Sequence, residues 1–256
     1  MNYRITFLGT GTSQGIPVIG CECRVCMSTD FRDKRLRTSV HIQSHEASVV
    51  IDTGPDFRYQ CLKNKINTLD AVLFTHEHMD HIAGLDDIRP FNFFNGKSVE
   101  IWAEQRVQQS IKRIYHYAFE EDKYPGVPEL HLNTITENVS FFVKDMEIYP
   151  FRVMHKSMPV LGFKIGSLCY ITDANFISEE VMKNIKNCQI LVINALRKEK
   201  HISHFNLEEA LEVIKKVNPE MAFLTHISHQ LGTYKEITAQ LPDNIRPAYD
   251  ELQILF

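Results

Sequence analysis

Short apolar runs recur along the whole chain between polar turns, which predicts a series of β-strands. The runs are rich in β-branched and aromatic residues, and each ends near glycine, proline or a polar cluster. The last three runs are apolar without interruption, as in strands that are buried on both faces. The predicted strands are Ile5–Leu8, Ser48–Ile51, Ala71–Phe74, Ser98–Trp102, Ile148–Val153, Leu168–Ile171, Ile190–Ile193 and Met221–Leu224.

Amphipathic stretches between these runs predict helices that alternate with the strands. In the clearest stretch, Leu207, Ala210 and Ile214 recur at helical spacing and therefore share one face. The predicted helices are Glu104–Phe119, Ser178–Lys186 and Leu207–Lys216.

The organisation of the chain predicts a single α/β domain. No proline-, glycine- or serine-rich linker, internal repeat or change of composition divides the 256 residues. We therefore expect one domain over residues 1–256. The stretch Glu120–Thr136, which contains two prolines and a glycine, is the best candidate for a loop or lid.

Composition and charge narrow the classes of function. Apolar residues make up 44% of the chain and charged residues 23%, values typical of soluble globular proteins. The net charge of -4 disfavours a nucleic-acid partner, because binding to phosphates relies on a basic surface. The first apolar stretch is too short and too polar for a signal peptide, and no apolar run is long enough to cross a bilayer. We therefore expect a cytoplasmic protein with no membrane partner.

The strongest chemical signal is the segment 76–81, which reads His-Glu-His-Met-Asp-His directly after a predicted strand. Its three imidazoles and one carboxylate are ligands suited to zinc or another first-row divalent ion. Extended backbone would aim His76 and His78 to the same side, and Asp80 and His81 would reach a second ion after a turn. The spacing therefore suits two adjacent metal ions. The alternative is a solvated, histidine-rich loop.

This segment resembles the signature of the metallo-β-lactamase superfamily. Further motifs occur in the order of that superfamily. Asp52-Thr53-Gly54 lies upstream of this segment, and His155, Asp173 and His226 lie downstream, each after a predicted strand. The resemblance implies a four-layer αβ/βα sandwich with two metal ions at one edge of two packed sheets. It implies that one ion is held by His76, His78 and His155, the other by Asp80, His81 and His226, and that Asp173 bridges the two.

Three residues of these further motifs are open to other interpretations. His155 could be a surface histidine beside Lys156, and Asp173 could cap a helix over Phe176–Met182. Asp52 is better suited to orienting a ligand histidine than to binding metal itself.

A second metal site is indicated by Cys21, Cys23 and Cys26, within a loop over about residues 20–30. Three clustered thiols in a chain without an export signal favour metal over disulfides, and a tetrahedral zinc site needs a fourth ligand, for which we choose His229. This combination resembles the PhnP-type cyclic phosphodiesterase branch of the superfamily, in which a Cys3His zinc lies apart from the catalytic pair. The alternative is three reduced, redox-reactive cysteines in a loop.

The resemblance also implies a general acid, His204, which precedes Phe205-Asn206-Leu207. The alternative is that His204 and Asn206 only organise the start of the next helix. The segment from Gly9 to Gly15 superficially suggests a dinucleotide-binding loop, but it leads into Pro17 instead of a helix, so no nucleotide cofactor is expected.

The function implied by this resemblance is hydrolysis of a small phosphodiester, in particular a ribose cyclic phosphate, by a metal-bridging hydroxide. Asp80 and His204 are the expected catalytic residues, and the cofactors are two divalent ions, zinc or manganese, with one structural zinc. Three alternatives remain open: an RNA-processing nuclease resembling tRNase Z, a non-catalytic binding protein resembling PqqB, and an esterase or lactonase. A monomer and a homodimer are both compatible with the sequence.

Overall fold

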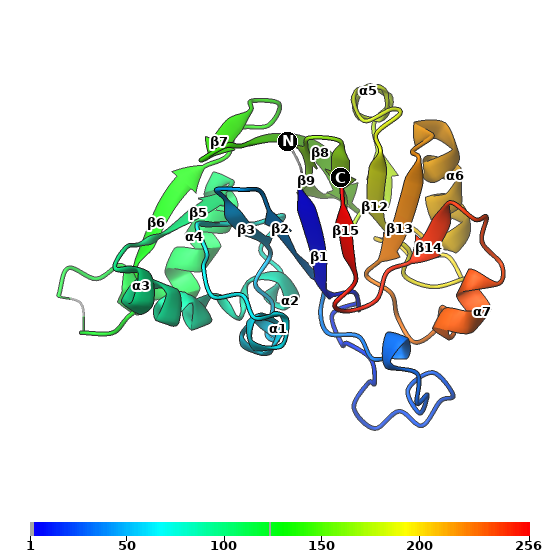
Figure 1. Cartoon of the computed structure of the whole chain (residues 1–256), viewed down its shortest axis with the longest axis horizontal. Helices are drawn as coiled ribbons and strands as arrows, with labels where there is room; N and C mark the ends of the chain where they lie inside the picture. Colours follow the sequence, from blue (N-terminus) through cyan, green and yellow to red (C-terminus); the bar gives the residue numbers. More distant parts are fainter. Residues whose placement is uncertain (1–2, 123) are drawn as a thin grey trace.

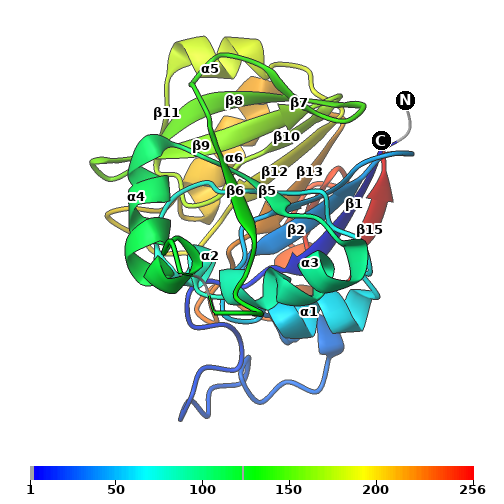
Figure 2. The same cartoon turned by 90° about the vertical axis from the view of Figure 1, so that its left-hand side faces the viewer.

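A computed structural model describes residues 3–122 and 124–256 of the chain. Two β-sheets pack face to face, and helices cover the outer face of each sheet (Figures 1 and 2). This confirms the four-layer αβ/βα sandwich.

The first sheet has the strand order β15-β1-β2-β3-β4-β5-β6. Pairing is antiparallel from β15 to β3 and parallel from β3 to β6. The strands are β1 (Arg4–Gly9), β2 (Ser39–Gln43), β3 (Ser48–Ile51), β4 (Ala71–Leu73), β5 (Val99–Ala103), β6 (Leu130–Thr134) and β15 (Gln253–Leu255).

The second sheet has the order β11-β8-β9-β10-β12-β13-β14, and β7 pairs with β8 outside this path. It too is antiparallel on one side, up to β10, and parallel from β10 to β14. The strands are β7 (Phe141–Val143), β8 (Met146–His155), β9 (Met158–Ile165), β10 (Leu168–Tyr170), β11 (Phe176–Ile177), β12 (Ile190–Asn194), β13 (Met221–Thr225) and β14 (Ile245–Pro247).

The helices bury apolar faces against the outer sides of the two sheets. In α6, Asn206 caps the first turn by a reciprocal capping box with Glu209, and Asn218 ends the helix in the left-handed conformation. The first sheet is covered by α1 (Phe57–Asn64), α2 (Met79–Ile82), α3 (Arg89–Asn95) and α4 (Gln105–Ile114), and the second by α5 (Glu179–Asn184), α6 (Leu207–Val217) and α7 (Tyr234–Thr238). Three 3-10 turns lie at Phe31–Asp33, Leu85–Ile88 and His116–Ala118.

The central core lies between the sheets and fixes their relative position. Alternation along β3 shows the layering: Val49 and Ile51 pack into the core between the sheets, whereas Val50 packs against the helices. Phe7 of the first sheet meets Phe223 of the second, with ring centroids 5.7 Å apart. Burial of this apolar surface is the main stabilisation of the sandwich.

All eight predicted strands and all three predicted helices are confirmed, with shifts of a few residues at their ends. The prediction of a loop over Glu120–Thr136 is wrong in part, because Leu130–Thr134 forms the edge strand β6; Lys123 lies outside the described residues. An edge strand carries polar residues, since one of its sides faces solvent, and this hid β6 in the sequence pattern. Within residues 3–122 and 124–256, no helix is both long enough and apolar enough to cross a membrane.

Candidate metal centre

Strand ends bring the predicted ligands to one edge of the sandwich. His76 follows β4, His155 ends β8, Asp173 follows β10 and His226 follows β13. The last two of these residues have positive φ angles, 54° and 53°, and Asp52 after β3 has 63°. Non-glycine residues in this left-handed region are uncommon and gather at functional sites, because the surrounding structure must hold them there.

Asp173 lies at the centre of the cluster and is 2% exposed. Its Oδ2 atom lies 3.5 Å from His76 Nε2 and 3.3 Å from His81 Nε2, and its Oδ1 atom lies 2.8 Å from His226 Nδ1. The helix-cap alternative for Asp173 is wrong, since Ser178 caps the following helix through its side chain. One carboxylate therefore faces histidines from both halves of the molecule.

The first group consists of His76, His78 and Asp173, whose ligand atoms lie within 4.8 Å of one another. His76 Nε2 and His78 Nδ1 are 3.0 Å apart. Two imidazole nitrogens on a tetrahedral zinc would be about 3.3 Å apart, so the pair fits one shared ion. His155 lies beside His78, with ring centroids 5.2 Å apart, and forms a further group with Asp173 and His204.

The second group consists of Asp80, His81, Asp173 and His226. His81 Nε2 is 3.3 Å from Asp80 Oδ2. Both His81 Nε2 and His226 Nδ1 are buried atoms without a hydrogen bond, although each faces a carboxylate. Buried imidazole nitrogens that face carboxylate oxygens without hydrogen-bond geometry suit a divalent cation between them.

Asp52 determines which nitrogen two of the histidines present to the centre. Its Oδ2 atom accepts a hydrogen bond from His81 Nδ1 at 2.7 Å and another from the Thr75 hydroxyl at 2.8 Å. The Thr75 oxygen in turn accepts from His76 Nδ1 at 2.9 Å. Both histidines therefore engage Nδ1 in a hydrogen bond and turn Nε2 toward the centre, which is the orienting role predicted for this carboxylate. A Cβ atom at Gly54 would overlap the carbonyl oxygen of Asp80, which explains the glycine of this motif.

Two further contacts orient His155, which is half-buried, and His226, which is buried, and the sequence did not reveal them. His155 Nδ1 donates to the carbonyl oxygen of Ser203 at 2.8 Å, and His226 Nε2 lies 3.2 Å from the Thr12 hydroxyl. Thr12 belongs to the glycine-rich N-terminal loop, which reaches the site because Gly11 bridges to Ile227. A backbone acceptor and a hydroxyl from a distant loop leave no local sequence signal.

The charges of the site depend on one another. Burial lowers the pKa of His81, but the carboxylates of Asp173, Asp80 and Asp52 outweigh this effect and raise that pKa well above its ordinary value. Burial raises the pKa of Asp173, but His226 and His81 outweigh it and bring that pKa well below the usual range. The ionised carboxylates thus require positive charge at this point, which a proton or a bound divalent cation can supply.

His204 lies against the same cluster. Its ring stacks on His226 with centroids 4.9 Å apart and meets His155 at 4.5 Å, and its buried Nδ1 has no hydrogen-bond partner. Burial and the charge of His226 lower the pKa of His204 to about 3. The start of the following helix is organised by Asn206 and not by His204, which leaves the imidazole directed at the centre.

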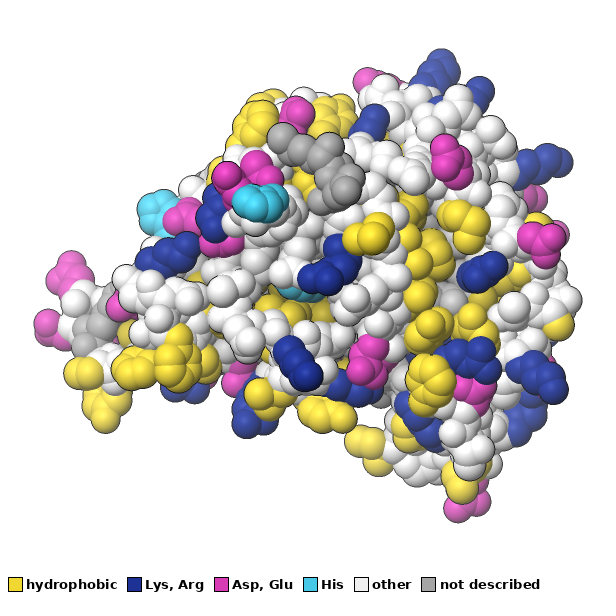
Figure 3. Space-filling view, viewed as in Figure 1, with side chains coloured by type: hydrophobic (Ala, Val, Ile, Leu, Met, Phe, Trp, Pro, Cys, Tyr) yellow, Lys and Arg dark blue, Asp and Glu magenta, His cyan; other side chains and the backbone are white. Residues whose placement is uncertain are grey.

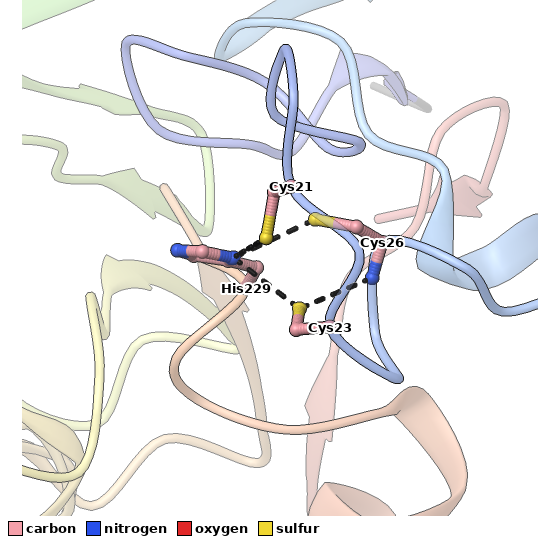
Figure 4. Close-up of side chains that lie close together, drawn as sticks. All are labelled: Cys21, Cys23, Cys26 and His229. Carbon is pink, nitrogen blue, oxygen red and sulfur yellow. Dashed lines mark hydrogen bonds between the residues drawn. The ribbon is translucent and has the colours of Figure 1, made fainter.

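Cys21, Cys23, Cys26 and His229 form a separate cluster (Figure 4). The three sulfur atoms lie 3.3, 3.4 and 3.5 Å from His229 Nδ1. In a tetrahedral Cys3His zinc site the sulfur–nitrogen distance is about 3.6 Å, so the cluster has the dimensions for zinc. The remaining cysteines, Cys61, Cys169 and Cys188, are buried.

Comparison with known proteins agrees with this geometry. A family model described as the Beta-lactamase superfamily domain matches residues 47–227. The chain belongs to the metallo-β-lactamase superfamily. A solved structure of a diphosphatase from the PhnP family superposes with a TM-score of 0.94 at 35% identity, covering 100% of this chain and 98% of that one. This confirms the resemblance to the PhnP branch.

Two other similar proteins differ more in length or sequence from this chain. An octanoyltransferase of Porphyromonas gingivalis is 41% identical over 254 residues, which are 98% of this chain and 51% of that relative. The chain thus spans about half of the length of that protein, whose name describes the whole polypeptide. Zn2+-bound PqqB from Methylobacterium extorquens has a TM-score of 0.80 at 18% identity, covering 98% of this chain and 99% of that one, and shows the shared fold. Membership of the superfamily and the clusters of histidine and aspartate together indicate a divalent-metal centre.

Proposed function

We propose that this protein is a two-metal phosphodiesterase that hydrolyses small substrates, with ribose cyclic phosphates as the leading class. The observation that carries the proposal is the convergence of buried, pre-oriented imidazole nitrogens on the carboxylate of Asp173. Ligands whose far nitrogens are already hydrogen-bonded lose little freedom when an ion binds.

Each residue of the centre has a proposed role. His76, His78 and His155 would hold one ion, Asp80, His81 and His226 the other, and Asp173 both. Divalent ions bound there supply a nucleophile at neutral pH by lowering the pKa of water, and they stabilise negative charge on the phosphate. The Cys3His cluster, apart from this centre, would hold a structural zinc.

His204 is the proposed proton donor to the departing oxygen, because its ring lies beside His155 and His226 and its Nδ1 has no hydrogen-bond partner among the described residues. Its pKa, lowered to about 3, keeps it neutral before substrate binds. The role therefore requires an anionic substrate, since negative charge beside an imidazole raises its pKa. The other proposed catalytic residue, Asp80, is a ligand and acts through the ions.

A second candidate function is hydrolysis of a diphosphate linkage. The diphosphatase from the PhnP family, with a TM-score of 0.94, favours it. The same centre serves either reaction. In both, water attacks phosphorus, and negative charge develops on the phosphate oxygens in the transition state. On the face in Figure 3, basic side chains are interspersed with acidic and apolar ones, which favours a small substrate over RNA.

Substitution of the ligands tests the mechanism. His76→Ala and Asp80→Ala should abolish hydrolysis of bis(p-nitrophenyl) phosphate while the fold, followed by circular dichroism, is retained. His116→Ala is a matched control, because that side chain is 70% exposed and lies outside the centre. Full activity in either ligand variant would rule out the proposed centre.

A substrate panel then decides between the two linkages. Cyclic ribose phosphates, linear diesters, dinucleoside diphosphates, precursor tRNA and lactones should be compared by kcat/KM. Highest activity on cyclic phosphates supports the leading proposal, and highest activity on diphosphates supports the second. Preference for precursor tRNA or for a lactone would overturn both.

A further inference from the structure

We propose that Arg106 is a positioning residue for the histidines of one proposed ion, His76, His78 and His155, and not for those of the other ion, His81 and His226. The inference rests on the proposed two-metal function. The observation behind it is a single guanidinium that contacts Glu77, between His76 and His78, and Pro159, on the strand that pairs with the one ending at His155.

The two contacts come from different nitrogens of the guanidinium. Nη1 of Arg106 donates to the carboxylate of Glu77, and Nη2 donates to the carbonyl oxygen of Pro159. The ion pair is partly shielded, with side chains 29% and 26% exposed. Arg106 lies in the first turn of α4, where Val107 is buried against the sheet, so its backbone is anchored.

Both partners lie next to the histidines in the chain or in the sheet. Glu77 stands between His76 and His78. Pro159 of β9 pairs with Met154 of β8, one residue before His155 at the end of that strand. The guanidinium therefore fixes the metal-binding turn after β4 relative to the β8–β9 hairpin.

A neighbouring ion-pair network holds the guanidinium in place. Glu104 lies 3.5 Å from Arg106 Nε and is bound from the other side by Arg152, with one hydrogen bond of 2.8 Å. Arg152 itself bonds Glu137 at 3.0 Å. A planar fork with donors in fixed directions suits two partners at once, whereas a lysine ammonium on a flexible stem does not.

The histidines of the other proposed ion are held by other contacts. His81 is fixed by Asp52, and His226 by Thr12, and no hydrogen bond or ion pair found in residues 3–122 and 124–256 joins Arg106 to either. Loss of Arg106 should therefore weaken one ion selectively. Removing a direct hydrogen-bond partner of a ligand typically changes metal affinity by about 10- to 100-fold, and Arg106 acts one contact further out, so a loss near the lower end, about 10-fold, is expected.

The experiment titrates metal-free protein with Co2+ and follows its visible spectrum and heat of binding. Thiolate charge-transfer bands report the Cys3His cluster separately from the histidine centre. In Arg106→Met, one centre ion should bind about 10-fold more weakly, while the other keeps its wild-type affinity. Arg106→Lys should recover part of the affinity for this ion. Glu77→Gln should lose less of that affinity than Arg106→Met, because its amide oxygen still accepts from the arginine.

Arg89→Met is the control, since it removes another ion pair, with Asp86, whose side chains are 51% and 30% exposed. Unchanged affinity for both ions in Arg106→Met, or an equal loss of both, would overturn the proposal. If Arg106→Met does not fold, Arg106→Lys and Glu77→Gln replace it. Weaker binding of one centre ion in either variant supports the proposal, and wild-type affinity for both ions in both variants overturns it. Failure of the wild type to bind two ions at the centre would instead contradict the proposed function.

Discussion

Replacement of Asp52 by asparagine tests how the ligand histidines are oriented. The carboxylate is completely buried and accepts three hydrogen bonds: from the Thr75 backbone N–H at 2.9 Å, the Thr75 hydroxyl at 2.8 Å and His81 Nδ1 at 2.7 Å. An asparagine of the same shape presents one acceptor and one donor group in place of two acceptors. At least one of the three donors must therefore face another donor.

The size of the effect follows from the orientation of the new amide. If its NH2 group faces His81, that ring must exchange its proton to Nε2, the nitrogen that would bind metal. If the amide turns round, the buried N–H of Thr75 loses its acceptor, which costs about 1–3 kcal/mol. The first orientation should weaken metal binding by about 10- to 100-fold, equivalent to about 1.4–2.7 kcal/mol.

The assay measures zinc affinity of metal-free protein by competition with a chromophoric chelator, alongside urea unfolding without metal. Asp70→Asn is the matched control, because Asp70 also accepts a backbone N–H, from Ser48, but precedes β4 instead of following it. Wild-type zinc affinity and wild-type stability together in Asp52→Asn would refute the reasoning. Equal losses in both variants would show that any shielded, hydrogen-bonded carboxylate has this effect, since the Asp70 side chain is 11% exposed.

Three further predictions concern other parts of the molecule. Burial lowers the pKa of His41 from 6.5 to about 4, so between these values the unfolded chain binds more protons and the fold loses stability as pH falls, on the order of 2–3 kcal/mol. Urea unfolding at pH 7 and pH 4.5 should show a loss of stability that is smaller by this amount in His41→Gln than in the wild type, and parallel pH profiles would contradict it. His229→Ala should lose the tightly held zinc and keep much of the centre's metal; unchanged zinc content rejects His229 as a ligand. His204→Ala should lose far more rate with a poor leaving group than with p-nitrophenolate, and equal losses would argue against proton donation.

Much of the fold could be predicted because its central strands are buried on both faces. β12 and β13 are continuous apolar runs, and these were located to within a residue. The short strands at the sheet edges are harder to predict from the sequence. β15 pairs on one side, with β1, and β6 carries polar residues. Such strands depend on pairing with a formed sheet, which local sequence does not encode.

The candidate site divides in the same way. The segment 76–81 could be found because its ligands are neighbours in the chain, and the fold brings Asp173 and His226 beside them. Thr12 and the carbonyl of Ser203 could not be found, because their roles arise only when distant loops meet. Arg106 gave no signal either, since an arginine in an amphipathic helix ordinarily faces solvent.

The central claim is that Asp173 stands between two divalent ions held by six other side chains. Anomalous diffraction from crystals grown with Mn2+, collected at the manganese edge, tests it directly. The account predicts two peaks, one among His76, His78 and His155 and one among Asp80, His81 and His226, with Asp173 contacting both. A single peak, or peaks only at surface carboxylates, would contradict it.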